Sequence, residues 1–252
     1  HPHEQRIAGE GEAGVTIDFN ARAEVAQLAD VLPFRMPQQV RGSADFTGSI
    51  LPKGGDTDVT IESGLTGITS TLPPPLSIRA DESRRLKVQF NQIGQPTEKI
   101  RVMLAGNSQG AAQAIDSPES RVTARFQRSF DANGLSKGFH GGVASVADAV
   151  SEAAIPEGMW LAGSLPRLDF DAWRAAIDTF YPAPAVAAAE TENGKSPIAG
   201  FDFRLGGLLA YGRPFKAMTL KGRHSAEGWR MTVDSMEASG DWATLSDEAL
   251  LE

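Results

Sequence analysis

The feature that most constrains this chain is a period of two in its hydrophobic residues. In the segment GVTIDFNAR, Ile17 and Phe19 alternate with Asp18 and Asn20. Because successive side chains of a strand point to opposite faces, this segment predicts a strand with one apolar and one polar face. The same alternation recurs in VRGSADFTGSI, TDVTIESGL, RLKVQFNQ, KIRVMLAG, SRVTARFQRS, GMWLAGSL, GFDFRLGG, FKAMTLKGR and GWRMTVDSM.

Turn-forming residues separate the alternating segments. Gly54-Gly55-Asp56, Gly94-Gln95-Pro96 and Asn133-Gly134 are combinations that favour turns. Roughly ten to twelve strands joined by such short connections indicate an antiparallel meander. The predicted fold is therefore mainly β: a long, curved antiparallel sheet with two short helices.

The first predicted helix lies near residues 23–32. Val25, Leu28 and Leu32 follow one another at i, i+3 and i+7. Pro33 ends this pattern, because proline cannot continue a helix.

The second predicted helix spans residues 169–181, directly after an alternating segment. Asp169 is its expected N-cap, since the carboxylate can accept hydrogen bonds from free amides of the first turn. We expect its apolar stripe to cover a trough on the sheet or, alternatively, to fill a closed core. That stripe consists of Phe170, Trp173, Ile177 and Phe180.

A segment of low complexity, residues 182–200, divides the chain. It is dominated by proline, alanine and polar residues and carries no apolar face, which predicts a flexible linker or insertion. Its NGKS tetrapeptide lacks the preceding glycine of a phosphate loop, where Ala189 stands instead. The predicted organisation is a β-groove segment over 1–181, the linker, and continuing antiparallel strands over 201–252.

Composition narrows the classes of function. The net charge is −8, which argues against a nucleic-acid partner. The chain contains no cysteine, so disulfides and thiolate metal sites are excluded. No apolar run approaches the roughly 18 residues of a membrane span. His140 and His224 stand alone, without ligand-spaced neighbours, and neither a metal nor a cofactor is expected.

One motif suggests an enzyme. Residues 106–110, GNSQG, fit the G-x-S-x-G elbow of serine hydrolases, and Ser108 could be followed by Asp171 or Asp202 and then His224. The context is wrong, because such an elbow needs a long following helix and a sheet of alternating strands and helices. We therefore expect no catalytic residues and keep the Ser108 hydrolase as a third reading.

What remains is an extended apolar surface. If the strands close into a sandwich, that surface becomes core, and the chain is a structural or interaction module. If the sheet stays open and curls, the surface becomes a trough that binds acyl chains. The residues predicted to line this groove are Ile17, Phe19, Phe46, Val59, Ile61, Val88, Phe90, Val102, Leu104, Phe126, Phe203 and Leu205.

Three segments carry a resemblance to a known family. SGLTGITSTLPPPLS (63–77), GMWLAGSLPRLDFDAW (158–173) and the strands of residues 200–233 resemble, in order, segments of the YhdP-like envelope proteins. These belong to the AsmA-like group, which includes TamB.

The resemblance implies a very long periplasmic sheet, folded lengthwise into a taco with a hydrophobic groove. It further implies an inner-membrane-anchored protein that carries phospholipids between the inner and outer membranes. This chain is then expected to be an internal segment, with acyl chains in the groove and head groups in solvent.

Overall fold

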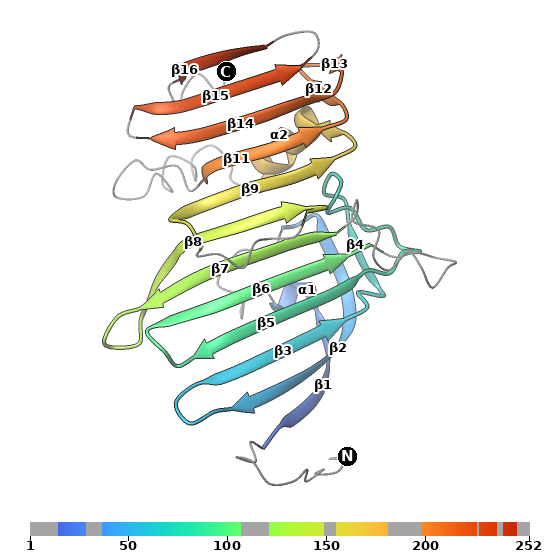
Figure 1. Ribbon diagram of the computed structural model, residues 1–252. Helices are drawn as coiled ribbons and strands as arrows, with labels where there is room; N and C mark the ends of the chain where they lie inside the picture. The colour runs from blue at the N-terminus through green and yellow to red at the C-terminus, as the bar shows by residue number, and fades with distance from the viewer. Residues whose placement is uncertain are drawn as a thin grey trace.

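The computed structural model describes residues 15–28, 37–106, 121–148, 155–180, 198–225, 227–235 and 239–245. One 13-stranded sheet dominates it, and β1 and β16 form its two ends without closing on each other (Figure 1). The strands along its path are β1 (Ile17–Glu24), β2 (Val40–Pro52), β3 (Thr57–Ser63), β5 (Arg85–Ile93), β6 (Thr97–Ala105), β7 (Val122–Phe130), β8 (Ser136–Val146), β9 (Gly158–Leu165), β11 (Ile198–Leu205), β14 (Met218–Ser225), β15 (Gly228–Ser235) and β16 (Ser239–Leu245). At about 4.8 Å per strand, this path is roughly 50 Å long.

The mainly β prediction is confirmed, but the all-antiparallel arrangement is wrong in the middle of the sheet. β9 pairs in parallel with both β8 and β11. Parallel neighbours need a connection that returns across the sheet, and here the β9–β11 connection contains a helix. From β1 to β8 and from β11 to β16, neighbouring strands are antiparallel as predicted.

The prediction of two short helices is confirmed for only one of them. α2 (Phe170–Phe180) begins as expected, with the Asp169 carboxylate accepting a hydrogen bond of 2.9 Å from the amide of Ala172. At the first position the described residues form a single turn, α1 (Val25–Leu28), which follows β1 without an intervening loop. Residues 29–36 lie outside the described part of the chain. Of the predicted linker, residues 198–200 belong to β11, and the rest is likewise not described.

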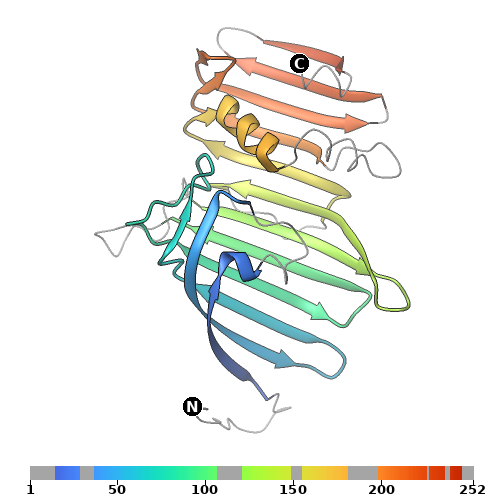
Figure 2. The same ribbon diagram turned by 180° about the vertical axis from the view of Figure 1, so that it is seen from behind.

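The first end of the sheet curls over one face. β2 pairs with β1 and β3 and, through its first residues, with the short strand β4 (Ile68–Ser70). In Figure 2, α1, β4 and the first half of β2 lie in front of the sheet. Five buried residues form a closed core under this curl: Val25, Ala44, Leu65, Ile68 and Ile78.

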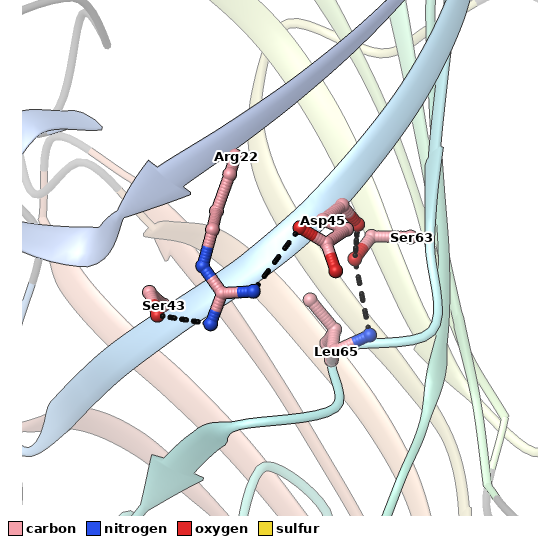
Figure 3. A network of polar contacts seen from close by, with 5 residues as sticks. All are labelled: Arg22, Ser43, Asp45, Ser63 and Leu65. Carbon is pink, nitrogen blue, oxygen red and sulfur yellow. Dashed lines mark hydrogen bonds and ion pairs between the residues drawn. The ribbon is translucent and has the colours of Figure 1, made fainter.

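Polar contacts hold the curl in place. Arg22 on β1 donates to the Asp45 carboxylate and the Ser43 hydroxyl of β2 (Figure 3). The buried Ser63 at the end of β3 donates to the Asp45 carbonyl oxygen at 2.8 Å and accepts from the Leu65 amide at 3.0 Å. These bonds satisfy backbone groups where the chain leaves the ladder, and they direct Leu65 into the core.

A second, smaller sheet accompanies α2. It consists of β10 (Leu168–Asp169), β12 (Leu208–Ala210) and β13 (Arg213–Phe215), and α2 contacts β12. α1 and α2 both lie behind the main sheet in Figure 1 and in front of it in Figure 2. Both helices are therefore on the same side of the sheet.

Candidate functional site

The candidate site is the apolar face of the main sheet, on the side of α1 and α2. Cross-strand pairing aligns its residues into continuous rows, because each strand keeps its alternation in register with the next. One row runs through Phe19, Gly48, Ile61, Val88, Val102, Ala124, Ala144, Leu161, Phe201, Gly222 and Met231. A neighbouring row runs through Ile17, Ile50, Val59, Phe90, Ile100, Phe126, Gly142 and Met159. The parallel pairs do not interrupt the rows.

Register places all twelve predicted groove residues on this one face. Sequence reasoning missed their neighbours Met159, Leu161 and Leu220, which come from strands that it did predict. Alternation alone gives two faces to each strand, whereas only pairing shows which positions of different strands meet.

The exposure of these residues is intermediate. Ten of the predicted twelve are half-buried, while Leu205 is 3% exposed and Ile17 is 51% exposed. No large described side chain is fully buried. A closed sandwich core would bury such residues almost completely, since protein interiors are close-packed. Most of the described apolar face is therefore less buried than a closed core, although Ile100 and Ala124 are each 7% exposed.

Two of the predicted groove residues occupy a different environment from the others. Phe46 and Leu104 pack against the closed core under the curl. Leu104 lies at the end of β6 nearest to that core, and Leu86 of β5 lies beside it in register. We call this margin of the apolar face the covered rim. The opposite margin, at the hairpin turns of residues 94–96 and 131–135, is the open rim.

Aromatic rings lie across glycines on the open part of the face. A Cβ atom added at Gly48 would lie 2.3 Å from Cζ of Phe19, and one at Gly222 would lie 2.2 Å from Cζ of Phe201. Phe126 covers Gly142 in the same way, at 2.7 Å. Each glycine leaves space for an aromatic ring from the neighbouring strand to lie against the sheet. A glycine opposite a predicted aromatic is the sequence signal for this arrangement, but it requires the register to be known.

A cluster of rings marks the C-terminal half of the face. The Phe201 centroid lies 6.3 Å from that of Phe203 and 5.6 Å from that of Trp229. The His224 ring is 5.2 Å from Trp229. Such offset pairs add packing energy beyond the area that they bury.

The predicted covering helix is only partly in contact with its surroundings. Phe170 packs on Tyr211 with ring centroids 5.9 Å apart, and the Trp173 indole donates to the Pro74 carbonyl at 3.1 Å. Ile177 is 51% exposed, and the side chain of Phe180 lies outside the described part. These contacts attach α2 to the small sheet and to the loop after β4. That the apolar stripe of α2 covers the face of the main sheet stays a prediction.

Asp171 shows how α2 is attached. Its carboxylate accepts hydrogen bonds from the amides of Gly212, at 2.8 Å, and Tyr211, at 2.7 Å. These amide contacts lower the pKa of Asp171 from its ordinary value. Asp171 therefore fixes the β12–β13 turn against the helix.

One ion pair interrupts the apolar face. Glu98 and Arg128 are directly paired across β6 and β7, next to the pair of Ile100 and Phe126. Their side chains are 6% and 20% exposed. Sequence reasoning missed this pair, because only strand register shows that Glu98 and Arg128 lie opposite each other.

The hydrolase reading finds no support in the described residues. Ser108 itself lies outside them. Asp202 pairs in register with Lys221 and forms an ion pair with it at 3.1 Å, whereas His224 falls on the opposite face of the same strand. Asp202 and His224 therefore cannot act together, and Asp171 is engaged with backbone amides.

Neither a metal cluster nor a membrane helix is found among the described residues. No group of three or more His, Asp or Glu side chains there is arranged to hold an ion. In the same part of the chain, no helix combines the length and hydrophobicity needed to span a bilayer.

Comparison with known proteins gives one match. A family model described as YhdP protein matches residues 1–250, nearly the whole chain. Searches of curated proteins and of solved structures return no significant match.

Proposed function

The chain belongs to the YhdP family, and on that premise we propose that its open apolar face binds the acyl chains of phospholipids. Family membership indicates an envelope protein related to lipid transport. The proposed role is that of a non-enzymatic segment of a periplasmic bridge, anchored in the inner membrane, along which lipids pass to or from the outer membrane.

A single observation carries the proposal: ten of the twelve predicted groove residues, on strands from β1 to β11, are only half-buried. An exposed apolar surface of this extent is unusual unless something binds to it. Each acyl CH₂ transferred from water to such a surface gains about 0.8 kcal/mol. Rows that run continuously from strand to strand suit a long, flexible chain better than a compact ligand.

The test places a charge on each face of one strand. Val88 and Gln89 are adjacent on β5, with Val88 on the apolar face and Gln89 on the polar face. Val88→Asp should abolish co-purification of phospholipid, measured by native mass spectrometry and lipid extraction. Gln89→Asp, the matched control, should retain lipid.

Urea denaturation of the same variants distinguishes an open apolar face from a closed core. On an open face, Val88→Asp should leave a folded protein, because the new carboxylate can remain hydrated. If Val88→Asp unfolds the chain, or if the wild-type protein carries no lipid, the face is core or spacer and the proposal fails.

A further inference from the structure

The Glu98–Arg128 pair differs in position from the other cross-strand ion pairs of the described sheet. Arg22–Asp45, Lys87–Glu62 and Lys221–Asp202 all lie on the polar face, where water surrounds both partners. Among the pairs that join two described strands, only Glu98–Arg128 lies on the apolar face.

Stability alone does not account for charges at this position. Removing two charges from water costs several kcal/mol per ion, and a buried pair is often no more stabilising than well-packed apolar residues. The next cross-strand pair along the same two strands is Ile100 with Phe126, so an apolar pair would continue the row without interruption.

Both hydrogen bonds of the pair end on one carboxylate oxygen of Glu98. Arg128 Nε and Nη2 both donate to the same oxygen of Glu98, Oε2, at 3.2 and 2.5 Å. Neither Glu98 Oε1 nor Arg128 Nη1 takes part in these bonds. The Arg128 guanidinium also lies 4.9 Å from the ring centroid of Phe130, which fixes its orientation from a second side.

The pair lies at the open-rim end of β6 and β7, where the Arg128 side chain is 20% exposed and the Glu98 side chain 6%. Glu98 is near the start of β6 at the open rim, and Leu104, six residues on, packs at the covered rim. At about 3.3 Å per residue, the apolar floor between them is roughly 20 Å wide. In Figure 1 the hairpin turns after β5 and β7 lie on the left, opposite β4 on the right.

We propose that Glu98 and Arg128 form a contact site for the head group of a zwitterionic phospholipid whose acyl chains lie on the apolar floor. Arg128 Nη1 donates to the phosphate, since guanidinium binds phosphate with strong, charge-assisted hydrogen bonds. Glu98 Oε1 accepts from the ammonium group. This inference rests on the proposed function and adds to it a polar contact at the open rim.

The experiment is a competition between two lipids with identical acyl chains. Wild-type protein is incubated with equimolar phosphatidylethanolamine and diacylglycerol, and the bound ratio is measured by native mass spectrometry. The double variant Glu98→Gln/Arg128→Gln should lower the preference for phosphatidylethanolamine about tenfold, the loss expected for one charge-assisted hydrogen bond. Glu62→Gln/Lys87→Gln makes the same change of charge on the polar face and should keep the preference.

If the double variant does not fold, the single variant Arg128→Lys provides a second test. Arg128→Lys retains a cation beside Glu98 but removes Nη1, and it should also lose the preference. If either folded variant keeps the wild-type ratio, or if the wild type binds both lipids equally, the head-group site is overturned while acyl binding stands. If the wild type binds neither lipid, the proposed function fails as well.

Discussion

The two rims of the apolar face are made of similar residues but are packed differently. At the covered rim, Ala44 and Ile68 are 1% and 4% exposed, because α1, β4 and the curl of β2 close over them. Toward the open rim, Val88 and Phe126 remain half-buried with the same alternation in sequence, although Ile100, the partner of Phe126, is 7% exposed. At the covered rim, a second layer of the chain buries the apolar residues. Apolar alternation in a sequence therefore predicts which face of a strand is apolar, but it does not predict whether another element covers that face.

The largest expected effect is at the covered rim. Ile68→Ala should lower the free energy of unfolding by about 2–4 kcal/mol, because it leaves a cavity in a closed core. Val88→Ala on the open floor should cost about 1 kcal/mol or less, since less surface is buried there. Urea denaturation measures both, and equal losses would remove the distinction between the two rims.

A middle-sized effect is expected where rings lie over glycine. Gly222→Ala places a methyl group 2.2 Å from the present position of Phe201 Cζ, so the ring must swing away from the sheet. We expect a loss of about 1–3 kcal/mol in stability, as for overpacked sites, and weaker lipid capture because the displaced ring enters the trough. Gly54, where an added Cβ meets nothing within 4 Å, gives a control as Gly54→Ala. Unchanged capture by the Gly222 variant would show that the ring does not enter the lipid path.

The smallest effect concerns Asp171 and pH. Its pKa is lowered in the folded protein by the amides of Gly212 and Tyr211, so its contribution to stability is present above its unfolded pKa of about 3.9 and is lost as the pH falls below that value. Asp171→Asn should therefore be less stable than wild type at pH 7, with the difference shrinking toward pH 3. Thermal denaturation across this range checks the prediction, and a difference independent of pH would contradict it.

Strands were predicted best where apolar residues on one face alternate with polar residues on the other. β5 and β6 were predicted nearly to their ends because Leu86, Val88 and Val102 alternate with polar residues. β8 was missed, since its positions on the apolar face include Gly142 and Ala144, which carry no hydrophobic signal of their own. Glycine there is required by the Phe126 ring on the neighbouring strand, a contact that no local pattern contains.

The residues of the candidate site could be predicted from the sequence, but their arrangement in space could not. All twelve predicted groove residues lie on one face, yet the assignment of Phe46 and Leu104 to the closed core needed the curl of β2. The parallel pairing of β9 was not foreseen either, because alternation is the same in parallel and antiparallel strands. The Glu98–Arg128 pair became visible only when register placed it beside Ile100 and Phe126.

The parallel pairing of β9 has a consequence for how the chain folds. From β1 to β8, and again from β11 to β16, each strand pairs with a near neighbour in sequence, so these parts can form step by step from local contacts. The β9–β11 pairs instead join residues 40 apart in the sequence, such as Leu161 and Phe201, so they must wait until the connecting segment has returned across the sheet, and such non-local closures are slow. We therefore expect two kinetic units that join at β9, with hydrogen exchange at the backbone amides of β9 reporting the late step.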